Sequence, residues 1–189
     1  MSTLDELVQR FWIAPDDAEW IPKTDVLPLS EVRKWMKSED VEVLGFAAAM
    51  IGDGRFRIEP PLPVDEYASF QMHYVGRCLR ESPDGEWSDS AYSAGWNLVR
   101  IYIHLWEDER VPRPILLDMK RWLADIYKGA DEKLRLCVVH VTLEHLFERG
   151  PIRQFFNDWQ KDPALAEAYK QASLWDRKTP LSSSSGKKR

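Results

Sequence analysis

The sequence contains few cysteines and few glycines, and it has no long uncharged hydrophobic run. Cys78 and Cys137 are the only cysteines among 189 residues, which is too few for a disulfide framework and gives no metal-ligand spacing. The sequence has nine glycines and no glycine-rich phosphate loop, so it offers few places where the backbone could approach a cofactor closely. Apolar runs fall far short of the ~18 residues that a membrane span needs, and the N-terminus lacks the order of a secretory signal. We therefore expect a cytoplasmic protein with no membrane span and no cofactor.

The chain is acidic, and its charge is unevenly distributed. Residues 177–189 hold five basic residues and no acid, so the other 21 basic residues and the 31 acids give residues 1–176 a formal charge of −10. A negative surface repels nucleic acid and attracts basic proteins, although many acidic surfaces serve only to keep a protein in solution. The sequence therefore predicts no nucleic-acid partner, and a basic protein is the partner that charge favours.

The segment 134–147 (LRLCVVHVTLEHLF) has nine apolar residues among fourteen, spread over most sides of a helical wheel. A helix of this kind is normally buried, with other helices on several sides. Its valines would also suit a buried strand, but Asp131 is a good N-cap, and Gly150 before Pro151 is a stop signal in which glycine takes the left-handed C-cap. We therefore predict a buried central helix over 132–148. Its inward stripe is expected to comprise Leu136, Val139, Leu143 and Leu146.

Two long helices are predicted to precede this segment. The first is capped by Ser88, Asp89 or Ser90 and runs to Trp106, and the second opens at the prolines 112 and 114 and closes at Gly129. Connections this short favour antiparallel neighbours, so residues 89–148 should form a three-helix unit with the central helix innermost. The core-facing stripes are expected to be Tyr92, Trp96, Val99, Ile103 and Trp106 on the first helix, and Ile115, Met119, Trp122 and Ile126 on the second.

Shorter elements are predicted on both sides of this unit. Apolar spacing indicates helices over 3–12, 31–37, 40–51 and 65–80, the second of them capped by Ser30, with proline-containing segments between them. Beyond the unit, a short helix is expected over 152–159 and a last one from Pro163 to Trp175.

The predicted fold is all-α, a single-domain helical bundle of about seven to eight helices with the central helix near 132–148 buried. The single domain is expected to span residues 1–176, with a proline-rich arm of short helices over 1–62 and a helical core over 64–176. Residues 177–189 (RKTPLSSSSGKKR) have the composition of a disordered basic tail.

The densest candidate chemistry is His140, Glu144 and His145 on the central helix. His140 and Glu144 are four residues apart and can form a hydrogen-bonded pair on one face, whereas His145 points about 100° away from Glu144. The pattern is not the HExxH of a zinc protease, and no third ligand follows at a recognisable spacing. His104, beside Glu107 and Asp108, is a second candidate on a polar helix face. We expect no metal site and a structural His140–Glu144 pair, with a hydrolase or metal-binding enzyme as the alternative.

Tryptophan beside clustered acids marks the candidate partner-binding surfaces. Nine tryptophans are many for one core of this size, and tryptophan is favoured at interface hot spots. Each tryptophan could equally fasten an arm to the helical body. The candidate residues are Asp16, Asp17, Trp20, Glu86, Trp87, Asp89, Glu107, Asp108 and Glu109.

The stretches GEWSDSAYSAGWNLVRIYIHLWED and LEHLFERGPIRQFFNDWQKDPAL resemble a group of small uncharacterised bacterial proteins, over roughly residues 55–175. Members of that group are all-helical proteins of the kind found beside polymorphic-toxin or defence genes. The resemblance implies an immunity or adaptor role and supplies no catalytic residues.

The sequence as a whole thus predicts a non-catalytic, acidic, helical protein-interaction module, an immunity or adaptor protein that binds a basic protein partner. Two alternatives remain: the hydrolase or metal-binding enzyme, and a homo-oligomeric structural protein. A homodimer is compatible with any of the three.

Overall fold

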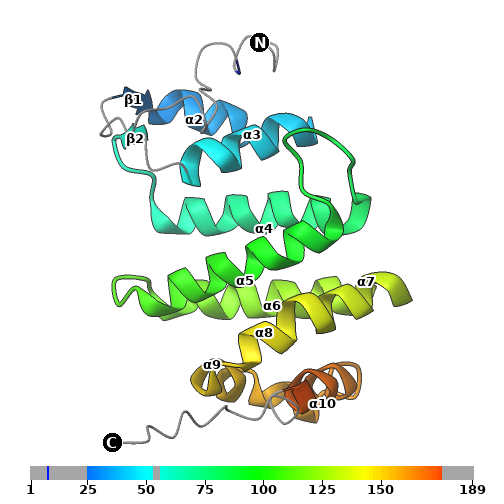
Figure 1. The fold of residues 1–189 in the computed structure, drawn as a ribbon. Helices are drawn as coiled ribbons and strands as arrows, with labels where there is room; N and C mark the ends of the chain where they lie inside the picture. Colours follow the sequence, from blue (N-terminus) through cyan, green and yellow to red (C-terminus); the bar gives the residue numbers. More distant parts are fainter. Residues whose placement is uncertain (1–7, 9–24, 53–55, 176–189) are drawn as a thin grey trace, which may run out of the picture.

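The computed structural model describes residues 8, 25–52 and 56–175, and it shows a stack of helices with two short strands at one end (Figure 1). The described part is broadly all-α, as predicted. The elements, in chain order, are β1 Asp25–Pro28, α2 Leu29–Trp35, α3 Val41–Gly52, β2 Phe56–Glu59, α4 Val64–Glu81, α5 Ala91–Glu107, α6 Arg113–Gly129, α7 Glu132–Cys137, the π-helical segment η2 Val138–Leu143, α8 Glu144–Phe147, α9 Gly150–Phe155, the 3-10 helix η3 Asn157–Lys161 and α10 Ala166–Trp175.

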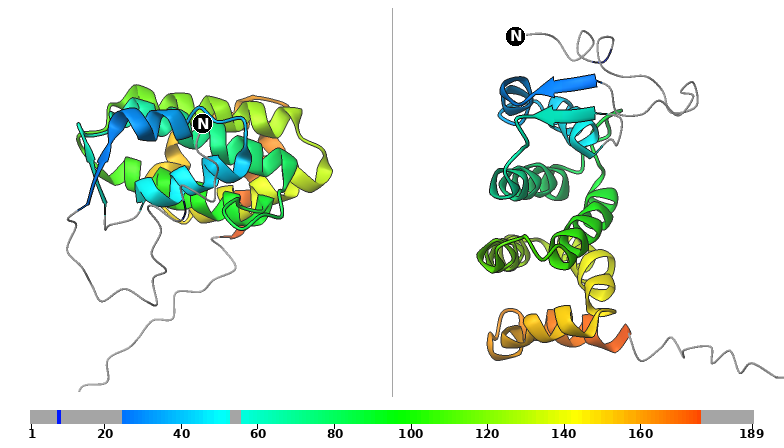
Figure 2. Two further views of the ribbon diagram at one scale, coloured as in Figure 1. Left: turned by 90° about the horizontal axis from the view of Figure 1, so that it is seen from above. Right: turned by 90° about the vertical axis from the view of Figure 1, so that its left-hand side faces the viewer.

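The helices lie in two columns when the stack is seen from the side (Figure 2). Helices α2, α4 and α6 form one column, and α3, α5 and the continuous helix α7–η2–α8 form the other, with α9 and α10 at the far end. Within the columns, α4 contacts α6, and α5 contacts η2. The fold therefore grows by adding helices along one direction.

The two strands were not predicted as a sheet. β1 and β2 pair in parallel, from Asp25 opposite Phe56 to Pro28 opposite Glu59. The prolines after residue 59 favour extended backbone, which agrees with β2, but the pairing joins segments about thirty residues apart and leaves no local pattern. The helix expected over 3–12 (Val8 apart) and the tail 177–189 lie outside the described residues.

The central helix is confirmed as helical and is buried through most of its length. Val138, Val139, Leu143, Leu146 and Phe147 are almost inaccessible to solvent. Its middle is π-helical, which sequence spacing did not reveal. Together these residues fill the space between α5 and α10.

The neighbours of the central helix differ from those expected. It lies between α5 and α10, whereas α6 packs mainly on α4 and α5, so the predicted arrangement with the central helix walled in by both preceding helices is wrong. Leu136, placed on the inward stripe by sequence, is 48% exposed. Leu136 lies on the same face of the helix as His140, which is one turn further on and is also exposed.

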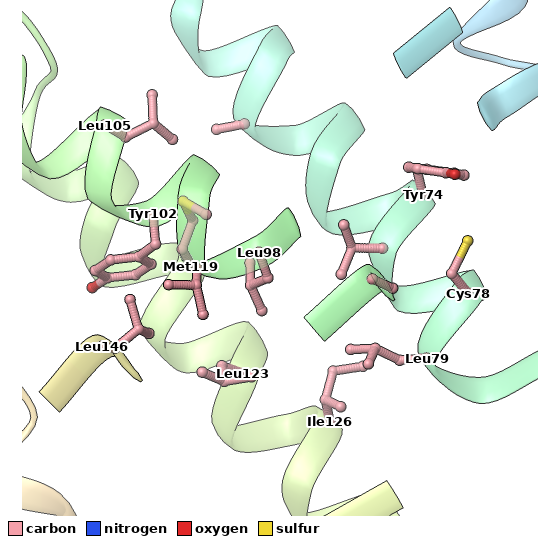
Figure 3. Packing of buried hydrophobic residues seen from close by; sticks show 14 of the residues in the cluster. Tyr74, Cys78, Leu79, Leu98, Tyr102, Leu105, Met119, Leu123, Ile126 and Leu146 are labelled. Carbon is pink, nitrogen blue, oxygen red and sulfur yellow. The ribbon is translucent and has the colours of Figure 1, made fainter. Parts of the chain in front are cut away.

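Helix α5 is rotated relative to the predicted stripe. Tyr92 is 61% exposed and Trp96 is 36% exposed, whereas the small residues Ala94 and Gly95 are buried. A Cβ atom at Gly95 would lie 2.9 Å from Cγ1 of Val141, so any larger residue there would force the Val141 side chain or α5 to shift. Val99 is buried as predicted, and the other core side chains of α5 are Leu98, Tyr102 and Leu105. These three lie near Met119, Leu123 and Ile126 of α6 (Figure 3).

Helix ends were predicted with mixed success. Ser90 caps α5 by accepting from the Ser93 amide, and Asp131 caps α7 by accepting from the Leu134 amide, as expected. Ser30 is not a cap, because α2 starts earlier, after Pro28. Gly150 is not a left-handed C-cap either, since it opens α9, and no described glycine has a positive φ. The last helix begins at Ala166, three residues beyond the expected Pro163.

Lys120 is a buried cation that sequence reasoning missed. It lies on α6 with its Nζ atom donating to the Phe155 carbonyl oxygen at 2.8 Å and ion-paired with Asp158. The ammonium also lies 4.8 Å from the centroid of the Phe155 ring. A buried charge is tolerated only when it is paired, so Lys120 fastens α6 to the segment around α9 and η3.

Replacing Leu143 by alanine is expected to destabilise the protein by roughly 2–5 kcal/mol, because the side chain is fully buried in the central helix. Leu136→Ala, on the exposed part of the same helix, is the control and should change the free energy of unfolding by no more than about 0.5 kcal/mol. Chemical denaturation of both variants measures the difference. Equal losses would contradict the burial described here.

Candidate interaction surface

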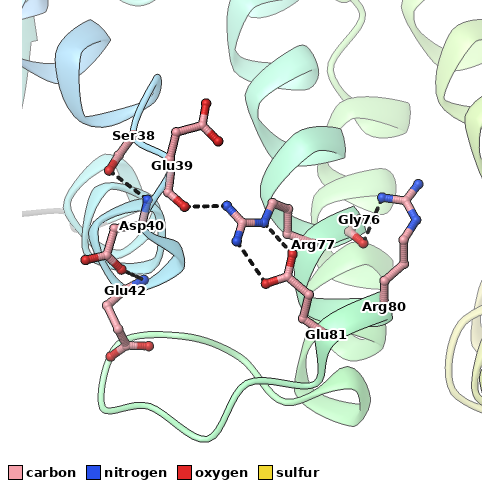
Figure 4. A network of polar contacts seen from close by, with 8 residues as sticks. All are labelled: Ser38, Glu39, Asp40, Glu42, Gly76, Arg77, Arg80 and Glu81. Carbon is pink, nitrogen blue, oxygen red and sulfur yellow. Dashed lines mark hydrogen bonds and ion pairs between the residues drawn. The ribbon is translucent and has the colours of Figure 1, made fainter.

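Exposed acids gather where the α2–α3 turn meets the loop between α4 and α5 (Figure 4). We call this region the acidic edge; its exposed members are Glu39, Asp40, Asp84 and Glu86, beside the exposed Glu81, which is ion-paired with Arg77. Arg77 of α4 fastens the α2–α3 turn to that helix: it donates to the Glu39 carbonyl oxygen at 2.7 Å and to both carboxylate oxygens of Glu81, at the end of α4. The guanidinium of Arg77 is therefore already engaged within the protein.

Glu42, in the first turn of α3, anchors the α4–α5 loop. Its carboxylate accepts hydrogen bonds from the amides of Trp87 at 2.9 Å and Ser88 at 3.1 Å. Burial raises the pKa of the Glu42 carboxyl, but hydrogen bonding to Ser88 and to the amides of Trp87 and Glu86 outweighs it, and the pKa lies below its ordinary value. The loop is thus tied to α3 by an ionised side chain.

Two glycines permit this contact. A Cβ atom at Gly45 would overlap the Trp87 carbonyl oxygen, and one at Gly85 would overlap the Glu42 carboxylate. Both glycines have ordinary negative φ values, so close approach is what they provide. The loop consequently lies directly on the surface of α3.

A second set of hydrogen bonds holds the end of the loop to α4 and α5. The Tyr74 hydroxyl lies 3.0 Å from both the Asp89 carboxylate and the Asp89 amide, and Asn97 donates to the same carboxylate at 2.8 Å. Burial raises the pKa of Tyr74 far above its ordinary value. Asp89, a sequence-predicted partner-binding residue, is therefore engaged inside the protein.

Trp87 and Glu86 have different surroundings on this loop. Trp87 is half-buried, and its ring meets that of Phe46 edge to face with a centroid distance of 5.1 Å. This contact fastens the loop to α3, which was the structural alternative for the residue. Glu86 beside it is exposed.

The other predicted acidic cluster lies at the end of α5. Glu107 pairs with Arg149 at 2.7 Å, and Asp108 pairs with Arg110 at 2.7 Å, while Glu109 is exposed. Hydrogen bonds from the Arg110 side chain and amide hold the pKa of Asp108 well below its usual range. Two of the three acids therefore already have basic neighbours. Asp16, Asp17 and Trp20 lie outside the described residues.

The histidines form two separate pairs and no triad. His140 Nδ1 lies 2.7 Å from Oε1 of Glu144, as predicted, whereas His145 Nδ1 lies 3.0 Å from Oε1 of Glu148. The His145 ring also stacks on Trp96 with a centroid distance of 4.1 Å. His104 is exposed on α5. His145 therefore does not join His140 and Glu144 in one site.

The described ranges offer little other reactive chemistry. There, no three His, Cys, Asp or Glu side chains are grouped so as to hold a metal ion. Burial raises the pKa of the Cys78 thiol to about 11 and also raises that of Cys137, which makes both poor nucleophiles. Among the same residues, no helix combines the length and apolar character that a bilayer span requires.

A cleft of about 600 Å³ lies between α2 and α4. The bidentate pair of Arg33 with Glu66, at 2.6 and 2.8 Å, crosses its wall, and Lys37, Asp65 and His73 also line it. The charges of both signs balance, so the lining selects no particular class of ligand.

Glu42→Gln is expected to destabilise the protein by roughly 1 kcal/mol at pH 7, a reduced value because the carboxylate is part exposed. Since the folded pKa of Glu42 is lowered, its contribution is present above the unfolded pKa of about 4.3 and is lost as the pH falls through the folded value. The difference in unfolding free energy between wild type and variant should therefore shrink on acidification. Glu86→Gln, in the same loop, is the control, and a pH-independent difference for Glu42→Gln would refute the anchor.

Comparison with models of protein families, with curated proteins and with solved structures gave no match.

Proposed function

We propose that the chain is a non-catalytic helical interaction protein that binds a basic protein partner through its acidic edge, in the role of a bacterial immunity or adaptor protein. The observation that carries the proposal is the construction of that edge. Its exposed acids lie on the α2–α3 turn, which Arg77 fastens to α4, and on the α4–α5 loop, which Glu42 fastens to α3. A surface ordered before binding loses little conformational entropy on association.

Charge supports a basic partner. Asp84 and Glu86 flank the glycine that lies against Glu42, so their side chains are carried by an anchored backbone. The neighbouring Arg77 is saturated by Glu39 and Glu81. Exposed acids in a body of formal charge −10 steer a cationic protein toward this surface and disfavour acidic competitors.

The hydrolase alternative has less support from the geometry. Its three residues divide between two pairs, and the thiols are not activated. The homo-oligomeric alternative remains a prediction from sequence.

Reversing charge on the edge provides the test. Three proteins are immobilised and exposed to lysate of the source organism. They are the full chain, the edge variant Asp84→Lys/Glu86→Lys and the matched variant Asp125→Lys/Glu132→Lys. The matched variant makes the same charge change at exposed positions on α6 and α7. Mass spectrometry at low and raised salt identifies bound proteins, and titration with the purified partner gives the affinity. We expect one basic partner whose binding weakens with salt and falls about tenfold or more in the edge variant alone.

Two results would overturn the proposal. One is the capture of no protein by the wild type at any salt concentration. The other is an equal loss of affinity in both variants, which would indicate general charge attraction rather than recognition at the acidic edge.

A further inference from the structure

One face of the central helix places an apolar, a nucleophilic and a carboxylate side chain one turn apart. Leu136 is 48% exposed, the His140 side chain is 52% exposed, and the Glu144 side chain is only 8% exposed. Glu144 Oε1 lies 2.7 Å from His140 Nδ1. The carboxylate is therefore enclosed by protein while the ring that it contacts remains open to solvent.

The hydrogen bond determines which ring nitrogen is free. An ionised carboxylate can only accept, so beside ionised Glu144 the neutral imidazole of His140 carries its proton on Nδ1 and keeps its lone pair on Nε2. The half-exposed ring then presents Nε2 away from Glu144. Carboxylate–histidine pairs of this kind fix the tautomer and the ring orientation.

His140 is mounted on an immobilised part of the fold. It lies within η2, whose neighbouring residues Val139 and Val141 are buried, and the Thr142 hydroxyl donates to the Gly95 carbonyl oxygen of α5 at 3.3 Å. π-Helical turns are rare and occur frequently at functional sites. A fixed backbone and a fixed tautomer together hold Nε2 in one direction.

The other histidines lack this combination. His145 is 22% exposed at its side chain and lies against Trp96. His73 and His104 are exposed, but in the described part of the chain neither side chain is hydrogen-bonded to a carboxylate. His73 and His104 therefore serve as internal controls, because they are exposed but no carboxylate orients their rings.

We propose that His140 accepts a phosphoryl group at Nε2 from an acyl phosphate. The Nε2 lone pair forms a bond to phosphorus, the bond from phosphorus to the acyl oxygen breaks, and a carboxylate leaves with that electron pair. The Nδ1 proton stays in the hydrogen bond to Glu144, whose negative charge offsets the positive charge that develops on the ring. The products are Nε2-phosphohistidine and a free carboxylate.

His140 lies on an open helix face, which suits reaction with a donor that approaches from solvent better than catalysis within a cleft. The clefts between α2 and α4 and between α6 and η3 are lined by other residues. An open helix face admits a donor carried by a second molecule, and the exposed Leu136 offers that molecule an apolar contact. This inference goes beyond the proposed partner binding, since the chain would be a phosphoryl acceptor, and it does not depend on the acidic edge.

Reaction of the full chain with acetyl phosphate tests the proposal. Intact mass and ³¹P NMR follow incorporation, and fragmentation under neutral conditions, where phosphohistidine survives, locates the modified residue. We expect modification at His140 roughly tenfold or more faster than at His73 or His104. Glu144→Gln should lower the His140 rate about tenfold, and His140→Gln should abolish the fast phase.

Circular dichroism establishes whether Glu144→Gln is folded. If it is not, the comparison of His140 with His73 and His104 within the wild-type chain decides the matter alone. Equal rates at the three histidines, faster reaction at His145, or no incorporation at His140 would each overturn the proposal.

Discussion

The close approach of α5 to the π-helical part of the central helix is the contact on which the architecture depends. Gly95 makes it possible, because a side chain there would meet Val141. The approach buries Leu98, Val99 and Tyr102 on α5 and Val139 and Leu143 on the central helix. It also turns Tyr92 and Trp96 toward solvent. One small residue in α5 thus decides which face of that helix forms core.

This contact explains where sequence reasoning succeeded and where it did not. Proline spacing and the caps Ser90 and Asp131 predicted the extent of α5 and of the central helix, because those signals are local. Tyr92 and Trp96 were wrongly predicted to face inward, since hydrophobicity favours large aromatics and gives no weight to a glycine, whereas Val99 is buried as predicted. The buried cation Lys120 was missed for a different reason, because its partners Phe155 and Asp158 lie more than thirty residues away in the sequence.

The candidate sites show the same division between local and distant contacts. The His140–Glu144 pair follows directly from a spacing of four on a helix, and the structure contains it. The anchoring of the α4–α5 loop by Glu42 spans 45 residues of sequence and has no signature in either segment alone. The sequence of residues 84–89 therefore indicated an acidic loop, but it did not indicate that this loop lies beside the α2–α3 turn. What makes it a rigid surface is tertiary structure.

The growth of the stack along one direction has a consequence for how its parts respond to stress. In such an arrangement the main contacts of a layer are with its immediate neighbours, so cooperativity is short-ranged. The loop 82–90 and η2 both contact α5, but from opposite sides. Fraying of β1, α2 and α3 would expose the loop's anchor without necessarily releasing the central helix. Opening at that end leaves the contacts of the central helix with α5 and α10 in place, so the two ends of the stack differ in what holds them folded.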